Sequence, residues 1–296
     1  MNSQFIKCPC CSSENTFLPF IINPCIDTKS ISSDLVFHIS KCSNCGFVTQ
    51  YPKKNKDVYT KLGYHTQENY EEHCINRAQY IFNFLGLNRI INTTMFRILD
   101  LGSGRGGVGY FLKNEIEKLG VSASVEGVTL QKEENTYINT LYLDIDEPSD
   151  LIEIAFNKKY DLIIMSHSLE HLLYPGQILS IIDEYLLNTG GLVYIEVPSL
   201  YTTQVRTKNQ FISQHISYFT KKSLTNLIHN NSRLNIVKMK QSNYWGNIKC
   251  LLVKHAPSDN LKYTKERFVN TKYYLSQIKN TFYRFITKFK TIGNND

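Results

Sequence analysis

The sequence predicts an α/β protein with a mostly parallel central sheet and flanking helices, preceded by a small cysteine-rich module and followed by a helical tail. Between residues 68 and 255, apolar strand-like runs alternate with longer amphipathic stretches, as in β-α-β units. Residues 1–60 hold six of the eight cysteines and several turn signals. Residues 258–296 are basic and carry apolar side chains at helical spacing. These differences divide the chain into three expected regions.

The composition of the 296 residues is that of a globular protein, with 42% hydrophobic and 20% charged side chains. It excludes collagen-like, coiled-coil and wholly disordered chains. The longest apolar runs, such as 162–165, are far too short to span a membrane. The chain reaches its first cysteines without an apolar stretch, so no signal peptide is expected. We therefore expect a cytoplasmic protein with reduced thiols.

The net charge of +7 is concentrated near the end of the chain. From Lys254 onward, nine Lys or Arg residues oppose three Asp or Glu residues, which leaves a net charge of +1 for the 253 residues before them. The body of the protein is therefore close to neutral, which argues against a broad surface for nucleic acid.

The expected elements of the middle region follow the order of an α/β domain. A helix near 75–85 begins it, because its apolar residues recur at helical spacing. A short buried strand at 97–101 leads into a glycine loop and a helix near 107–118. The remaining expected elements are strands at 123–128, 140–143 and 160–165, a helix near 176–187, a strand at 192–197 and a final pair at 234–240 and 247–253.

Two C-x-x-C pairs, Cys8/Cys11 and Cys42/Cys45, are separated by 30 residues. Each pair can present two thiolates from one turn, and two such turns supply the four sulfur ligands of a structural Zn²⁺ site. Cys10 lies in the first turn as well and stays an alternative to Cys11. Two such pairs in a cytosolic chain favour a zinc-ribbon-like module over redox-active thiols.

A glycine-rich loop follows the first expected strand and opens the next helix, where backbone N–H groups can approach a polar ligand. Gly102, Gly104 and Gly107 match the G-x-G-x-x-G fingerprint of dinucleotide-binding dehydrogenases. Asp100, Gly102, Gly104 and Gly106 match the first motif, D-x-G-x-G-x-G, of class I methyltransferases that use S-adenosylmethionine. The loop alone leaves both interpretations open, together with a bare structural turn.

Two later segments resemble class I methyltransferases. Asp161, His167, Glu170 and His171 stand in a segment that resembles their D-x-I-x-x-x-H-x-L-E-H motif at the fourth strand. Residues 190–198 resemble their glycine turn and fifth strand. Three motifs in this order favour a Rossmann-like domain with S-adenosylmethionine as its cofactor over one that binds NAD.

A cysteine-rich N-terminus ahead of such a domain resembles the sugar C-methyltransferase group, over nearly all of residues 1–255. The resemblance implies a small-molecule acceptor, namely a sugar or similar metabolite, in that group nucleotide-linked and destined for a surface polysaccharide or a natural product. Tyr59 and Tyr64 stand where that group places substrate-facing tyrosines, with ordinary packing as an equal alternative.

The resemblance also assigns the glycine loop to the cofactor. Gly102, Ser103, Gly104 and Gly106 would wrap its methionine and ribose side. Asp100 would orient the loop or meet the methionine ammonium group.

Adenine and ribose contacts are expected after the second and third strands. Thr129 and Leu130 lie in a segment that resembles the G-V-T-L-S-x-x-Q version seen in cyclopropane-forming methyltransferases, with Glu134 in place of the usual Gln. Asp144 would accept a hydrogen bond from the adenine amine, and Asp146 is the alternative.

Ser166 and His167 follow the fourth strand, at the edge where open α/β sheets bind ligands. We expect both to line the site beside the reacting methyl group. Glu170 and His171 are expected to cap or pack the following helix.

His215 is the candidate general base, because imidazole titrates near neutrality. Residues 214–220 resemble the E-H-x-S-Y-F-S segment of the sugar C-methyltransferases. Gln214 replaces the glutamate of that segment, and Ile212 stands where the group has a tyrosine. These departures weaken C-methylation, which must stabilise a carbanion, more than O-methylation.

The basic tail is expected to form an amphipathic helix that packs on its own domain or on the second subunit of a homodimer. Contact with an anionic membrane surface or nucleic acid is the alternative. For the whole chain, an RNA methyltransferase is the runner-up, although no N-P-P-Y-like tetrad is present. A zinc-containing binding protein with an inactive Rossmann-like domain is the third hypothesis.

Overall fold

The computed structural model describes residues 7–14, 17–20, 25–27, 35–50, 69–130, 132, 136–156, 158–201, 211–241, 246–254 and 266–277. Among these residues, no helix is both long enough and apolar enough to cross a membrane.

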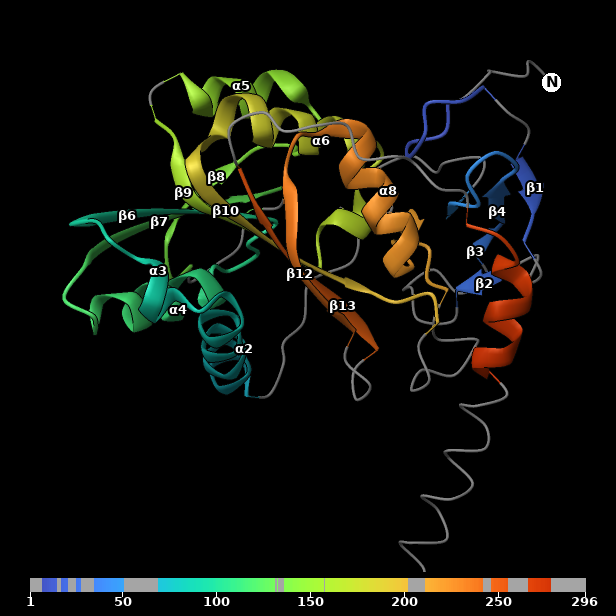
Figure 1. The fold of residues 1–296 in the computed structure, drawn as a ribbon. Coiled ribbons are helices and arrows are strands. Elements are labelled where there is room, and N and C mark those ends of the chain that lie inside the picture. The colour runs from blue at the N-terminus through green and yellow to red at the C-terminus, as the bar shows by residue number, and fades with distance from the viewer. Residues whose placement is uncertain are drawn as a thin grey trace, which may run out of the picture.

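A seven-stranded sheet forms the centre of the molecule, in the order β12-β13-β10-β9-β6-β7-β8 (Figure 1). Neighbouring strands from β8 to β10 run parallel, whereas β13 pairs antiparallel with both β10 and β12. The expected mostly parallel α/β sheet is thereby confirmed. Its strands are β6 (Met95–Leu101), β7 (Ser122–Thr129), β8 (Asn139–Tyr142), β9 (Tyr160–Ser166), β10 (Leu187–Pro198), β12 (Asn235–Gln241) and β13 (Asn247–Val253).

Helices cover both faces of this sheet (Figure 1). One face carries α2 (Tyr70–Leu85), α3 (Leu87–Ile90) and α4 (Gly107–Glu117), and the other carries α5 (Pro148–Ala155), α6 (Pro175–Ile181) and α8 (Lys221–Asn231).

The apolar run of β9 explains why it is covered on both sides. Leu162 and Ile164 pack into the core under α2 to α4, while Ile163 and Met165 pack into the core under α5, α6 and α8. Side chains alternate between the two faces of a strand, so a continuous apolar run is typical of a sheet buried on both faces.

The expected helix near 176–187 is shorter than predicted. Helix α6 ends at Ile181, a π-helical turn η2 (Ile182–Leu186) follows, and β10 already begins at Leu187. The pairing of β10 with β9 shifts register between Leu187 and Leu192, so the glycine turn lies within the strand as an irregularity. Gly190, with φ 77°, supplies the left-handed backbone there.

The N-terminal region forms its own antiparallel sheet, in the order β1-β4-β5-β11. Its strands are β1 (Phe17–Pro19), β4 (Ile39–Cys42), β5 (Val48–Gln50) and β11 (Ser217–Tyr218), with β2 (Cys25–Asp27) and β3 (Leu35–Phe37) as a separate pair. Strand β11 comes from the middle region of the chain. The two regions therefore share a sheet.

A helical segment at 269–277 is the described part of the basic tail. Val269 and Tyr273 are buried in a cluster with Phe20 and Ile39 of the N-terminal region. The Phe20 and Tyr273 rings meet edge to face, with their centroids 5.4 Å apart. This part of the tail packs on its own chain, and residues 278–296 lie outside the described residues.

The strand order reverses between β6 and β9, because the chain moves outward from β6 to β7 and β8 and then returns to the other side of β6. In open α/β sheets, ligands bind beyond the carboxyl ends of the strands at such a reversal. The glycine loop follows β6 and His167 follows β9, so both meet at this edge.

Candidate active site

A cavity of about 540 Å³ opens at this edge of the sheet, within the size range of ligand pockets. Part of its lining comes from residues at the carboxyl ends of β6, β7, β8 and β9, which are the residues expected to hold a cofactor. The other part comes from α2, from η1 (Leu169–His171) and from the segment 212–216. Tyr59 and Tyr64, the expected substrate-facing tyrosines, and Glu134 lie outside the described residues.

The glycine loop is folded tightly against the end of β7. The amides of Gly102 and Ser103 both donate to the carbonyl of Val128, at 2.8 and 3.0 Å. Gly102 has φ 84°, and a Cβ atom built on it would lie 2.5 Å from Cβ of Ser168. Only glycine fits there, because the backbone is left-handed and the neighbouring loop touches it. Gly102, Ser103 and Gly104 line the cavity.

Gly106 does not line the cavity and instead is the N-cap residue of α4. A Cβ atom on it would lie 2.4 Å from Cγ1 of Ile138. The last glycine of the motif therefore allows the backbone to pack closely against the side chain of Ile138.

Asp100 is buried at the end of β6 and lines the cavity. Burial raises the pKa of its carboxyl to about 7, although the amide of Gly109 and the charge of Arg77 act in the opposite direction. A carboxylate held in this way gains from a cationic ligand, which would offset the cost of its burial.

The residues after β7 and β8 also lie at the cavity. Thr129 is buried and Leu130 is exposed, and both contribute to the lining. Asp146 accepts hydrogen bonds from the amides of Leu173 and Tyr174, at 2.9 and 3.2 Å, and so holds the loop after β9. Asp144 lines the cavity and accepts from the amide of Asp146 at 3.0 Å.

His167 leaves β9 with φ 58°, a left-handed conformation that is uncommon for a residue with a side chain. Its ring lies between two carboxylates, with Nδ1 3.3 Å from Glu170 and Nε2 3.7 Å from Glu196. Burial alone would lower the pKa of His167, but the two carboxylates raise it to about 9. Ser166 and His167 both line the cavity, as expected for residues at this strand end.

Two charged residues of this network were not predicted. Glu196 on β10 is buried and lies 3.9 Å from the Arg77 guanidinium and 3.8 Å from the Lys249 ammonium group. Arg77 belongs to α2 and lines the cavity. No local pattern in the sequence connects these positions, because α2, β10 and β13 are brought together only by the sheet.

His215 lies at the cavity beside His171, with the ring centroids 4.9 Å apart. Glu170 is 1% exposed, and the donor atoms of Glu170, His171 and His215 all lie within 4.8 Å of one another. Glu170 and His171 were expected only to cap or pack. Two adjacent ionisable residues shortly after the strand Tyr160–Ser166 were the signal that could have marked them as site residues.

The family of the chain follows from the comparison with known families. A model described as a methyltransferase domain matches residues 50–232, well over half of the chain. The chain belongs to this methyltransferase family. The enzyme is therefore a methyltransferase, as the three motifs predicted, and the dehydrogenase alternative for the glycine loop falls away. A search of curated proteins returned no match.

Several solved structures are similar to the methyltransferase. The plantazolicin methyltransferase BpumL in complex with SAH is 16% identical, covers 62% of this chain and 86% of its own, and gives a TM-score of 0.48. The 1,6-didemethyltoxoflavin-N1-methyltransferase of Burkholderia thailandensis is also 16% identical, with 75% and 97% covered and a TM-score of 0.46. The CurJ carbon methyltransferase is 11% identical, with 70% and 60% covered and a TM-score of 0.47.

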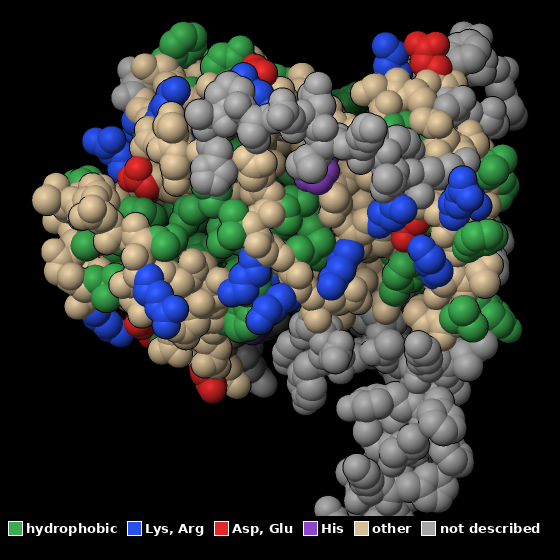
Figure 2. Space-filling model, viewed as in Figure 1, with side chains coloured by type: hydrophobic (Ala, Val, Ile, Leu, Met, Phe, Trp, Pro, Cys, Tyr) green, Lys and Arg blue, Asp and Glu red, His purple; other side chains and the backbone are tan. Residues whose placement is uncertain are grey.

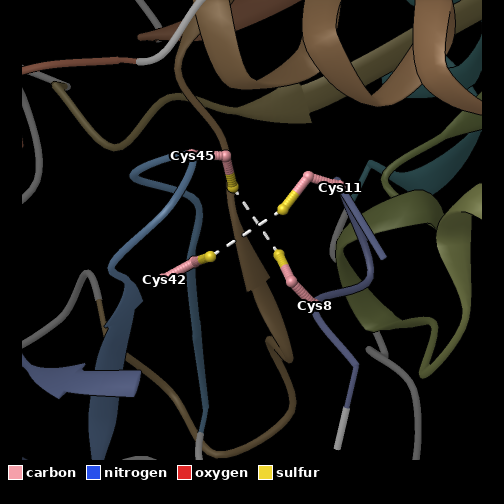
Figure 3. Close-up of side chains that lie close together, drawn as sticks. All are labelled: Cys8, Cys11, Cys42 and Cys45. Atoms are coloured by element: carbon pink, nitrogen blue, oxygen red, sulfur yellow. Dashed lines mark hydrogen bonds between the residues drawn. The ribbon is translucent and has the colours of Figure 1, made fainter. Parts of the chain in front are cut away.

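A cluster of four cysteines lies apart from the cavity of the methyltransferase. Figure 3 shows Cys8 and Cys11 from one turn and Cys42 and Cys45 from another, with all four sulfur atoms pointing to one centre. The Sγ atoms of Cys8 and Cys45 are 3.6 Å apart, and those of Cys11 and Cys42 are 3.9 Å apart. Four sulfurs at about 2.3 Å from one Zn²⁺ in a tetrahedron would be about 3.8 Å apart, so the residues present fit that ion.

Cys10, the alternative ligand, does not belong to the group of four sulfur atoms. Its sulfur lies 3.9 Å from the carbonyl of Ser223 on α8, and its own carbonyl accepts from the side chain of Asn230 at 2.9 Å. The first turn of the cysteine cluster is thereby fixed to the helix that follows the active-site segment.

The N-terminal sheet reaches the active site through Gln50. Its side-chain amide lies within hydrogen-bond distance of the carbonyls of Ile212, Ser213 and His215, at 3.3, 2.9 and 2.9 Å. Thr49 donates to the carbonyl of Ile216 at 2.8 Å. Sequence reasoning missed both residues, because a buried Thr-Gln pair in a strand carries no catalytic signal.

Proposed function

We propose that the enzyme methylates a hydroxyl group of a sugar or a similar small polar metabolite. The observation that carries this proposal is that the glycine loop and the His215 segment line one cavity of about 540 Å³. A cofactor bound at the glycine loop and an acceptor bound at the His215 segment would face each other across this cavity. Such an arrangement holds the acceptor oxygen in line with the methyl group, which is most of what a transfer from a sulfonium requires.

The cofactor is assigned to the residues that line its half of the cavity. Gly102, Ser103 and Gly104 would contact the methionine and ribose side, with the Asp100 carboxylate near the ammonium group. Thr129 and Leu130 would contact ribose and adenine.

Asp144 is assigned the hydrogen bond from the adenine amine, because Asp146 is already committed to the amides of Leu173 and Tyr174. Ser166 and His167 would lie beside the reacting methyl group, since both line the cavity at the end of β9.

His215 is assigned the removal of the acceptor proton in the simplest form of the mechanism. The proton passes to the imidazole while an oxygen lone pair forms a bond to the methyl carbon. The carbon–sulfur bond breaks, its electron pair returns to sulfur, and S-adenosylhomocysteine leaves. Imidazole is suited to this step because its pKa lies near neutrality.

The cysteine cluster is assigned to one structural Zn²⁺. The four thiolates of Cys8, Cys11, Cys42 and Cys45 would complete its coordination and leave no open position, so the ion would hold the two turns together without taking part in the transfer.

A sugar-sized acceptor is favoured over RNA by the charge of the molecule. The chain before Lys254 has a net charge of only +1. On the face shown in Figure 2, Lys and Arg side chains are spread over the whole width of the molecule and acidic side chains lie among them. A surface that binds the nucleic-acid backbone needs clustered positive charge.

The test is methyl transfer from S-adenosylmethionine carrying a radioactive methyl group. Nucleotide-linked deoxysugars, free sugars and total RNA are offered separately to wild-type protein and to His215→Ala. We expect label in a sugar, loss of turnover in His215→Ala and unchanged binding of S-adenosylhomocysteine. Label in RNA alone would overturn it. His38→Ala is the matched control, because that imidazole is exposed and does not line the cavity.

A further inference from the structure

Three side chains of the types that bind transition metals converge at the acceptor end of the cavity, away from the cysteine cluster. They are Glu170, His171 and His215, whose donor atoms lie within 4.8 Å of one another. We propose that they bind one divalent transition-metal ion and that this ion holds two neighbouring oxygens of the acceptor. The second half of the proposal rests on the proposed function, whereas the metal site does not.

Glu170 is the buried carboxylate of the set, and the His167 ring is its nearest cationic neighbour. It is 1% exposed, and among the described residues neither of its carboxylate oxygens has a hydrogen-bond partner. Nδ1 of His167 lies 3.3 Å from Oε1, which is within ion-pair range but not aligned as a hydrogen bond. The His167 ring offsets part of the cost of burying this carboxylate, and a metal ion coordinated by it would offset more of that cost.

His171 is held in the tautomer that a metal ligand requires. Its Nδ1 lies 3.0 Å from the carbonyl oxygen of Gln214. A carbonyl can only accept, so Nδ1 carries the proton and Nε2 keeps its lone pair. Nε2 lies 3.9 Å from Oε1 of Glu170. A histidine whose other nitrogen donates to a backbone carbonyl is the usual arrangement around protein-bound metals.

His215 completes the set from a separate segment of the chain. Its ring meets that of His171 at 71°, with the centroids 4.9 Å apart. The two segments are tied to each other directly, because the amide of Ile216 donates to the carbonyl of Glu170 at 2.8 Å. The three ligands are therefore positioned by backbone contacts before any ion arrives.

Binding requires the three side chains to close around the ion. Two adjacent ligands at about 2.1 Å from one ion are about 3.0 to 3.4 Å apart, so donor atoms separated by up to 4.8 Å must approach each other by up to about 1.5 Å, which side-chain rotation can supply. Two imidazoles and one carboxylate suit Mn²⁺, Fe²⁺ or Co²⁺ and differ from the all-thiolate cluster. Three protein ligands also leave positions open for oxygens of a substrate.

The ion would change the chemistry of His215 from base to ligand. A hydroxyl bound beside a divalent cation loses its proton more readily, because the cation stabilises the anion. The proton would leave to water, the oxygen would attack the methyl carbon, and the carbon–sulfur bond would break to give S-adenosylhomocysteine. The open positions fit an acceptor with adjacent oxygens, such as a vicinal diol or an α-hydroxy carbonyl compound.

The test uses the 296-residue protein and metal ions alone. Mn²⁺ is titrated first and followed by the electron paramagnetic resonance signal of the free ion, because thiolate clusters discriminate against Mn²⁺. Bound Co²⁺ is then counted per chain after removal of excess ion. We expect His215→Ala and Glu170→Gln to weaken Mn²⁺ binding at least tenfold and to lower bound Co²⁺ by one ion per chain. His38→Ala should match the wild type.

Metal binding that does not depend on His215, or no binding of either ion beyond the cysteine cluster, would overturn the site. Circular dichroism checks that each variant is folded, and His215→Gln replaces His215→Ala if the smaller side chain unfolds the segment. S-Adenosylhomocysteine is titrated on the same samples. Cofactor binding without a His215-dependent metal would reject the metal site alone, whereas absence of cofactor binding would reject the proposed function.

Discussion

The side-chain nitrogen of Gln50 lies 2.9 Å from the carbonyl oxygen of His215, although 164 residues separate them in the sequence. The same amide reaches the carbonyl of Ser213 at 2.9 Å. Strand β5, which carries Gln50, also pairs with β11 directly after the His215 segment. The N-terminal sheet therefore positions the candidate catalytic histidine, and the cysteine cluster lies at the other end of the same β4–β5 hairpin.

Gln50→Leu should lower turnover far more than cofactor affinity. The leucine fills a similar volume but leaves up to three carbonyls without the amide, so the segment that carries His215 can shift. A displacement of about 1 Å at a catalytic group can cost about 100-fold in rate. We expect kcat to fall 10- to 100-fold and the Kd of S-adenosylhomocysteine to stay within about twofold.

Gln177→Leu on the exposed surface of α6 is the matched control and should leave kcat unchanged. Equal turnover in Gln50→Leu and the control would show that the N-terminal sheet does not position His215.

Cys45→Ser should release the metal and weaken the whole hairpin. Its sulfur points into the cluster and also accepts from the amide of Phe47 at 3.4 Å. Structural zinc contributes directly to folding free energy, so we expect zinc content to fall and Tm to drop by several degrees. Cys10→Ser is the control, because its sulfur faces Ser223 rather than the centre of the cluster. Zinc loss in Cys10→Ser with retention in Cys11→Ser would reverse the assignment of the ligands.

Gly102→Ala should weaken cofactor binding, whereas Gly120→Ala should not. Both glycines have left-handed backbones, with φ 84° and 79°, so alanine costs about 1–2 kcal/mol of stability at either position. Only Gly102 has a close neighbour, because its added Cβ would lie 2.5 Å from Cβ of Ser168. We expect the Kd of S-adenosylhomocysteine to rise at least tenfold in Gly102→Ala and to change less than twofold in Gly120→Ala. An equal change in the calorimetric Kd for Gly102→Ala and Gly120→Ala would mean that the loop does not shape the cofactor site.

Asp100 should make stability fall as pH rises toward neutrality. Burial raises its pKa in the folded protein to about 7, above the ordinary value of 3.8. The folded state therefore favours the protonated carboxyl, and its stabilising contribution is full below about pH 4 and lost as pH rises through 7. Asp100→Asn removes this loss and should stabilise the cofactor-free protein at pH 8 by up to about 4 kcal/mol, at about 1.4 kcal/mol per pH unit.

The same substitution should weaken binding of S-adenosylhomocysteine at pH 8, because the ammonium group loses a carboxylate partner. Tm is measured from pH 5 to 8 for both proteins, and Kd is measured at pH 8. Parallel Tm curves for wild type and Asp100→Asn would contradict the assigned titration.

Elements whose determinants are local in the sequence could be predicted from it. The run 97–101, the glycines after it and the apolar run 160–165 each predict their strand or loop from adjacent letters, and all three lie where expected. The start of β10 was missed because its register with β9 shifts within the strand. Gln50 and Glu196 were missed for a different reason. Their roles come from pairing of distant strands, which no short pattern encodes.

The decisive measurement is calorimetric titration of the 296-residue protein with S-adenosylhomocysteine, with NADH in parallel. We predict one micromolar site for S-adenosylhomocysteine, weakened in Gly102→Ala, and no heat of binding for NADH. Binding of NADH without S-adenosylhomocysteine would contradict the assignment of the glycine loop to S-adenosylmethionine.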